Sequence, residues 1–248
     1  MTVPNYGTFN RSSQVSGVSG KSDNAYIRYM FGNTETSSGQ WAAQCGGARG
    51  PFRDAGPPLS DGDIRAALLS GGLAALANHN TLLEEVECWR GYVRADYVCL
   101  SPNTLTVIEI KSDRDSLRRF DEQVRVYSAM ADRVTVVVGW SLAAHVLRAA
   151  PFWWDIVLAE RETISELRFV PLRDGTHNPG VTATALVAML PVEEVRGLAR
   201  ASHLTFEGLR GRDLRQLIAS EVSCDELRVA VRKWMASRPQ QRLGSVPE

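Results

Sequence analysis

Apolar and polar positions along this chain follow several distinct periods, and each period predicts one kind of element. A Ser-Asp-Gly-Asp cap signal at residues 60–63 precedes Ile64, Leu68 and Leu73. This spacing predicts a helix that ends by residues 78–80.

Alternating runs and one continuous apolar run predict strands. Residues 92–100 and 104–111 alternate on either side of a Ser-Pro-Asn turn, which favours a β-hairpin. Residues 133–139 are almost continuously Val, a pattern typical of a strand buried on both faces in a parallel or mixed sheet. A further strand is expected around residues 154–159, with an edge strand at 167–170.

Helical patterns lie between these strands and after them. The Ser-Asp-Arg-Asp sequence at residues 112–115 has the spacing of a capping box, and apolar side chains recur on one face from there to residue 131. A short helix is expected over residues 142–149, and helical patterns resume from about residue 192.

These elements divide the chain into three parts. Residues 1–58 are rich in Ser, Gly, Asn and Thr, with too few apolar residues to order a core, so we predict a disordered polar tail. Residues 59–175 form the predicted α/β core, a mixed central sheet flanked by helices. Residues 176–248 form a small helical C-terminal region.

Composition limits the classes of protein that fit. The 248 residues have a formal net charge of zero, so no global field marks the chain as a nonspecific nucleic-acid binder. The four cysteines contain no C-x-x-C pair, which favours neither a zinc cluster nor a disulfide framework and fits a reducing, cytoplasmic setting. No apolar run approaches the ~18 residues of a membrane span, and we expect none.

Charged side chains interrupt the second strand of the hairpin at alternate positions. Because successive side chains on a strand point to opposite faces, Glu109 and Lys111 share one face while Ile108 and Ile110 point into a core. The hairpin can bring Asp96 of the preceding strand close to them. Two carboxylates suit a divalent cation such as Mg²⁺ or Mn²⁺, and a neighbouring lysine stabilises charge developing on a phosphate.

The order of these residues resembles the PD-(D/E)XK nuclease superfamily. An Asp is followed thirteen residues later by Glu-Ile-Lys and then by a helix bearing Gln-x-x-x-Tyr at residues 123–127, an element similar to that of the RecB-like branch. Residues 81–160 also resemble a group of uncharacterised bacterial and phage proteins placed in that superfamily. The resemblance implies a restriction-endonuclease-like core and Mg²⁺-dependent hydrolysis of DNA.

The resemblance also implies a role for each residue of the central motif. Asp96 and Glu109 would bind the metal, with the carbonyl of Ile110 as a further ligand, and Lys111 would position or activate the attacking water. Ala95 stands where the superfamily has the proline of its name, which makes the match less specific.

Three supporting residues follow from the same resemblance. Glu85 lies eleven residues before the Asp, the place of a Glu in the related group, and would support a second metal or a water network. A solvated acidic segment is the alternative for Glu85. Gln123 and Tyr127 would flank the cleft from the helix.

Residues outside this pattern have two interpretations each. At least one of Trp153 and Trp154 is expected in a core rather than stacked on bases. Arg114, Arg118 and Arg125 share a helical face nearly opposite the Gln of the motif, so a solvated face is expected rather than a phosphate-binding stripe.

Other functions remain open at this point. A nuclease fold without catalysis would bind nucleic acid or a protein partner, and a phage-defence or toxin component would wait for a partner held through the N-terminal tail. Residues 196–242 carry ten Lys or Arg against five Asp or Glu, which suits a nucleic-acid backbone. Within them, residues 214–219 and 227–236 form either a helix-turn-helix or a plain packing unit.

Overall fold

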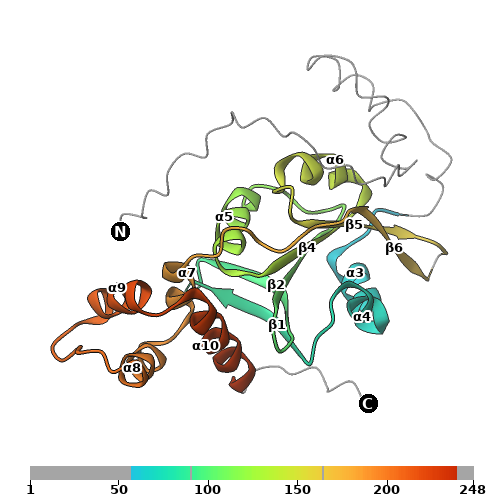
Figure 1. Cartoon of the computed structure of the whole chain (residues 1–248). Coiled ribbons are helices and arrows are strands. Elements are labelled where there is room, and N and C mark those ends of the chain that lie inside the picture. Colours follow the sequence, from blue (N-terminus) through green and yellow to red (C-terminus); the bar gives the residue numbers. More distant parts are fainter. Residues whose placement is uncertain (1–56, 90, 164, 239–248) are drawn as a thin grey trace, which may run out of the picture. The chain divides into compact units, whose positions relative to one another are not determined.

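The computed structural model describes residues 57–89, 91–163 and 165–238, which form a mixed six-stranded sheet flanked by helices (Figure 1). The chain is therefore α/β, as the sequence predicts. The polar tail predicted over residues 1–58 lies outside the described residues except for its last two positions. Within the described stretches, every helix is too short or too polar to cross a membrane.

The strands lie in the sheet in the same order as in the chain. They are β1 (Thr81–Cys88), β2 (Val93–Leu100), β3 (Leu105–Lys111), β4 (Arg133–Val138), β5 (Asp155–Arg161) and β6 (Leu167–Arg173). β2 pairs antiparallel with β1 and β3, β4 pairs parallel with β3 and β5, and β6 pairs antiparallel with β5. The predicted hairpin is thus β2 with β3, the predicted buried strand is β4, and the predicted edge strand is β6.

A broken helix covers one face of the sheet. It consists of α3 (Asp61–Ala67), the π-helical segment η1 (Leu68–Gly72) and α4 (Leu73–Leu76). The side chains of Ser60 and Asp63 form the capping box that starts α3, which confirms the predicted cap signal.

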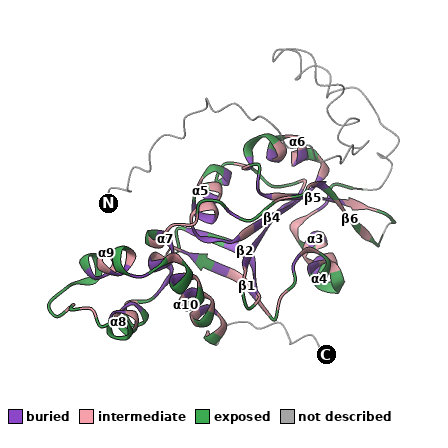
Figure 2. Ribbon diagram, viewed as in Figure 1, coloured by how far each residue is buried: buried purple, intermediate pink, exposed green. Residues whose placement is uncertain are grey.

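Apolar side chains of this helix pack on alternate positions of the hairpin. Ile64 and Leu68 belong to one buried cluster with Tyr97, Ile108 and Ile110. Because the two isoleucines of β3 enter this core, the two charged residues of β3 face the other side of the sheet, as strand alternation predicts. Figure 2 shows burial concentrated in the central strands.

The opposite face carries α5 (Phe120–Met130) and α6 (Trp140–Ala149). Trp154 is fully buried, with its ring edge-on to that of Phe120 at 6.0 Å between centroids, and Trp153 is 4% exposed. Both tryptophans therefore belong to the core, which confirms that prediction.

The helix predicted from Ser112 onward begins later, at Phe120, so that prediction was wrong in its start. Asp115 accepts the Ser112 N–H at 2.7 Å, but this bond closes an isolated turn. The carboxylate of Asp113 instead accepts backbone N–H groups from the segment before α3 and from the start of α6. These tertiary contacts hold the segment as a loop despite its capping-box spacing.

Two elements were not predicted from the sequence. β1 contains the acidic cluster at residues 84–87, whose charges obscure its strand pattern. α7 (Ala183–Met189) occupies part of the stretch after the predicted core, and Thr182 caps it by accepting the Ala185 N–H at 3.3 Å.

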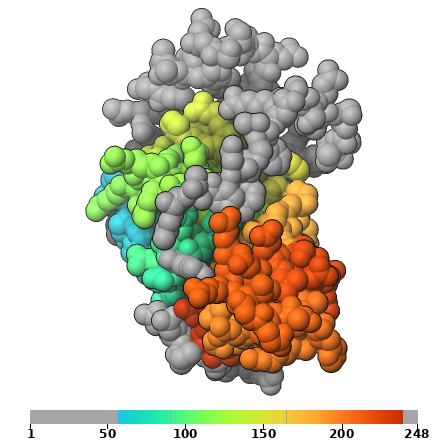
Figure 3. Space-filling view, turned by 90° about the vertical axis from the view of Figure 1, so that its left-hand side faces the viewer, coloured from blue at the N-terminus to red at the C-terminus, as the bar shows by residue number. Residues whose placement is uncertain are grey.

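The C-terminal region is helical, as predicted, and forms a continuous block in the space-filling view (Figure 3). After α7 come α8 (Val192–Ala201), α9 (Gly211–Glu221) and α10 (Cys224–Ser237). Both α9 and α10 pack on α7, so α7 is the centre of this block.

A buried carboxylate joins this block to the sheet. Asp132, whose side chain is 4% exposed, accepts the Leu105 N–H at 2.8 Å. It also forms ion pairs with two arginines of α10, Arg228 at 2.9 Å and Arg232 at 3.6 Å. One aspartate thus connects the beginning of β3, the end of α5 and α10.

Asp132→Asn should destabilise the fold strongly, because it leaves two arginines of α10 without their buried counter-charge. We expect a loss of about 2 to 3 kcal/mol in the free energy of unfolding, measured by urea titration, after allowance for the partial exposure of Arg228. The control is Arg196→Ala, which removes an exposed pair with Glu193 and should cost less than about 1 kcal/mol. Equal small effects of both changes would contradict the role of Asp132.

Candidate active site

The site begins where β2 and β3 separate. Their antiparallel register runs from Leu100 opposite Leu105 to Tyr97 opposite Ile108. Beyond that pair, Oδ2 of Asp96 accepts the N–H of Ile110 at 2.7 Å. The carboxylate of Asp96 therefore accepts the hydrogen bond that a backbone carbonyl of β2 would accept in a continued ladder. This bond holds Asp96 beside the end of β3.

Glu109 lies on the α5 face of β3 and is almost completely buried. Its Oε1 accepts hydrogen bonds from Nζ of Lys111 at 2.6 Å and from Nε2 of Gln123 at 2.5 Å. Its Oε2 accepts the hydroxyl of Tyr127 at 2.8 Å. The structure thus gathers the predicted Glu, Lys, Gln and Tyr around one carboxylate, although eighteen residues separate the first from the last.

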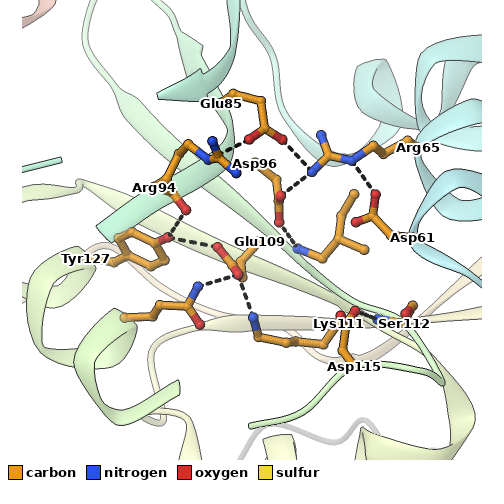
Figure 4. A network of polar contacts seen from close by, with 12 residues as sticks. Asp61, Arg65, Glu85, Arg94, Asp96, Glu109, Lys111, Ser112, Asp115 and Tyr127 are labelled. Atoms are coloured by element: carbon orange, nitrogen blue, oxygen red, sulfur yellow. Dashed lines mark hydrogen bonds and ion pairs between the residues drawn. The ribbon is translucent and has the colours of Figure 1, made fainter. Parts of the chain in front are cut away.

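A second cluster lies beside the first and contains Arg65, which sequence spacing did not predict (Figure 4). Nη2 of Arg65 contacts Oδ1 of Asp96 and, at 2.8 Å, Oε1 of Glu85. Nε of the same arginine donates to Asp61 at 2.5 Å. The other oxygen of Glu85 pairs with Nε of Arg94 at 2.7 Å. Five side chains, three acidic and two basic, therefore form one network in which opposite charges alternate.

The backbone of Glu85 is unusual. Glu84 pairs with Tyr97 and Val86 pairs with Ala95, but Glu85 between them has φ of 50°, in the left-handed region. A non-glycine residue adopts this region at a cost of roughly 1 kcal/mol or more, and such strain is concentrated at functional sites. The carboxylate of Glu85 lines the same cavity as Asp96 and Glu109.

These groups surround an open cavity of about 630 Å³. The acidic and basic side chains that line it are Asp61, Arg65, Glu85, Glu87, Arg94, Asp96, Glu109, Lys111, Asp115 and Arg119. With six carboxylates and four basic groups in this lining, the described part of the cavity has an excess of two negative charges when all are ionised.

Burial, and next the negative charge of Glu109, raise the pKa of Asp96 to about 7, although the Ile110 N–H and Arg65 act in the opposite direction. Burial also raises the pKa of Tyr127, and the charge of Glu109 adds to that effect, so its hydroxyl remains a donor. The folded site therefore disfavours the ionised form of both side chains.

The chemistry of this donor set fits a Mg²⁺ ion. Among the described residues, no three His, Cys, Asp or Glu side chains come close enough together to hold a metal ion. Mg²⁺ needs fewer, because it keeps several waters and is bound through one or two carboxylates. Asp96 and Glu109 supply two, and the excess of two negative charges matches one divalent cation.

Other predicted residues lie away from this centre. Arg114 and Arg118 are exposed, and the guanidinium of Arg125 lies over the ring of Tyr92 and donates to its hydroxyl at 2.8 Å. All three are exposed, as predicted, but the shared helical face was wrong, because α5 begins at Phe120 and carries only the last of them. Arg119, their neighbour, lines the cavity instead.

One local signal for Arg65 existed in the sequence. Asp61 and Arg65 stand four residues apart, the spacing of a helical ion pair. Nothing in that spacing indicates that the helix crosses the hairpin at Asp96, thirty-one residues further along the chain. Only the packing of α3 on the sheet brings the two together.

The raised pKa of Asp96 predicts a pH-dependent stability. Because the folded-state pKa lies above the unfolded value of 3.8, the stabilising effect of the bound proton is complete below that value and is lost as pH rises through about 7.

In metal-free buffer, Asp96→Asn, which does not titrate, should therefore gain stability relative to wild type as pH rises from about 5 to about 8. The slope should be at most ~1.4 kcal/mol per pH unit, measured by urea unfolding at each pH. A difference between the two proteins that stays constant over this range would refute the shifted pKa.

The comparisons with known proteins identify a matching family, but the descriptions of the matches name no reaction. The family model described as "Bacteriophage P4 protein cII" matches residues 61–245. The protein cII of Enterobacteria phage P4 is 26% identical over 149 residues, covering 60% of this chain and 55% of that protein. The chain thus matches about half the length of this curated relative.

A solved structure is also similar in part. The SPO1766 protein of unknown function from Silicibacter pomeroyi matches 48% of this chain and 77% of its own chain, with 21% identity and a TM-score of 0.31. A similarity at this level carries no conclusion about the site.

Proposed function

We propose that this chain, which belongs to the bacteriophage P4 protein cII family, is a Mg²⁺-dependent nuclease with a PD-(D/E)XK core that hydrolyses phosphodiester bonds of DNA. The observation that carries the proposal is the convergence of Asp96, Glu109 and Lys111 in one cavity, with Gln123 and Tyr127 bonded to the same glutamate. The resemblance to the PD-(D/E)XK superfamily implies this same set of residues.

Each of these side chains has a distinct task in the proposed reaction. Asp96 and Glu109 hold the cation, and the chemistry that bound Mg²⁺ supplies is polarisation of the phosphate and of a water molecule. Gln123 and Tyr127 orient the Glu109 carboxylate, because they donate to its two different oxygens. Fixed orientation of a ligand reduces the reorganisation that metal binding requires.

Lys111 is placed to act on the attacking water. Its side chain is 10% exposed and lines the cavity, so its ammonium group is largely desolvated while it still reaches the open space. A positive group in such a place stabilises the negative charge that develops on the phosphate as the water oxygen attacks phosphorus and the bond to the leaving oxygen breaks.

Lys111→Ala should reduce the rate of DNA cleavage at saturating Mg²⁺ and substrate by at least ~100-fold, because it removes that stabilisation. Cleavage is measured on linear, circular and single-stranded DNA, with RNA in parallel. The matched control is Lys233→Ala, which removes an exposed lysine of α10 and should leave the saturated rate unchanged. Activity of the Lys111 variant equal to that of the control would remove the basis for this site.

One feature of the network favours a second function, a nuclease-fold module that binds nucleic acid without cleaving it. Lys111 contacts Glu109 and Arg65 contacts Asp96, so protein cations already neutralise both carboxylates. The same assay separates the two functions. A pure binding module retains DNA affinity in EDTA and gives no cleavage on any substrate with Mg²⁺ or Mn²⁺.

A further inference from the structure

The guanidinium of Arg65 lies between the carboxylates of Asp96 and Glu85. The resemblance to the PD-(D/E)XK superfamily implies metal binding for both. A single nitrogen, Nη2, contacts both Asp96 and Glu85. A Mg²⁺ ion bound through two carboxylates makes the same pair of contacts, and a two-metal phosphodiesterase site holds a second such positive centre. Here a side chain of the protein itself occupies the bridging position.

Several contacts hold Arg65 in this place. Asp61, one helical turn earlier, accepts from Nε, and the guanidinium carbon lies 5.4 Å from the centre of the Tyr97 ring. The helix that carries Arg65 begins at the Ser60 capping box and is packed through Ile64, which is fully buried. The arginine is therefore built into the cavity wall by its own helix and by β2.

Both carboxylate oxygens of Glu85 form ion pairs with arginines. Its Oε1 pairs with Arg65 and its Oε2 pairs with Arg94, so each carboxylate oxygen has a cationic partner. A group that bound a second metal ion would have to give up at least one of these pairs.

The charge of the cavity also indicates a single ion. With Arg65 included and all groups ionised, as metal binding requires of Asp96, the lining has an excess of two negative charges. One divalent cation balances that excess, whereas two would leave the cavity positive by the same amount before substrate arrives.

We propose that Arg65 takes the place of a second metal ion, so that the site binds one divalent cation and the guanidinium contacts the substrate phosphate as the second positive centre. This inference rests on the nuclease function proposed above. Arginine suits the task because its planar fork presents several N–H donors to phosphate oxygens. Glu85 is then a positioning residue.

The first test counts bound metal without any cleavage. Mn²⁺ is titrated into the full-length, nucleic-acid-free protein, and the free ion is followed by electron paramagnetic resonance. We expect one bound Mn²⁺ in wild type and in Arg65→Lys, which keeps the charge, and two in Arg65→Ala, which frees Asp96 and Glu85. Two ions in wild type, or one in Arg65→Ala, would overturn the inference.

A second variant decides the matter if Arg65→Ala does not fold. Glu85→Gln should lower the Mn²⁺ affinity no more than Glu87→Gln, a change of equal charge on the same strand whose side chain lines the same cavity. If Glu85 were a metal ligand, Glu85→Gln would lower the affinity or the number of ions well beyond that control.

The failure of this inference and the failure of the proposed function give different results. Two Mn²⁺ ions in wild type, with cleavage that depends on Lys111, would leave the nuclease standing and remove the role given to Arg65. No Mn²⁺ bound by wild type, with no cleavage, would remove both. Cleavage that Asp96→Ala abolishes, with one ion bound, would support both.

Discussion

The hydrogen bond from the Ile110 N–H to Asp96 is the contact on which the site depends. It forms where the β2–β3 register ends at Tyr97 and Ile108, so a carboxylate stands where a strand would otherwise continue. The separation of the strands opens the cavity, and the bond ties Asp96 to the strand that carries Glu109. Without this bond, the buried N–H of Ile110 would lose its acceptor. Asp96 would then no longer be held at a fixed position relative to Glu109.

Charge balance explains the remaining architecture of the cavity. Burial and the charge of Glu109 together raise the pKa of Asp96. Three basic side chains from different elements form ion pairs with the carboxylates of the cavity: Arg65 from α3, Arg94 from β2 and Lys111 from β3. Buried carboxylates this close together are stable only with such partners. The remaining excess of negative charge is what makes a divalent cation the natural ligand in the proposed function.

The same logic of buried charge joins the C-terminal helices to the core. Asp132 lies at the far end of the β3–β4 pair from Glu109 and Lys111, and it holds Arg228 and Arg232 of α10. The helical region is thus fastened to the sheet near the beginning of β3, whereas the cavity opens near its end. Its positive charge is partly used in this attachment, which reduces the share available for a nucleic-acid backbone.

Local spacing was enough to predict the β2–β3 hairpin, the buried strand β4, the capped start of α3 and the shared face of Glu109 and Lys111, because alternation and capping act over a few neighbouring residues. It failed where distant segments compete for the same groups. Asp113 bonds to segments on either side of the sheet, which delays α5 to Phe120. The contact of Arg65 with Asp96 joins residues thirty-one positions apart. Only the packing of α3 across the sheet creates it, because no local period records which helix face meets which strand.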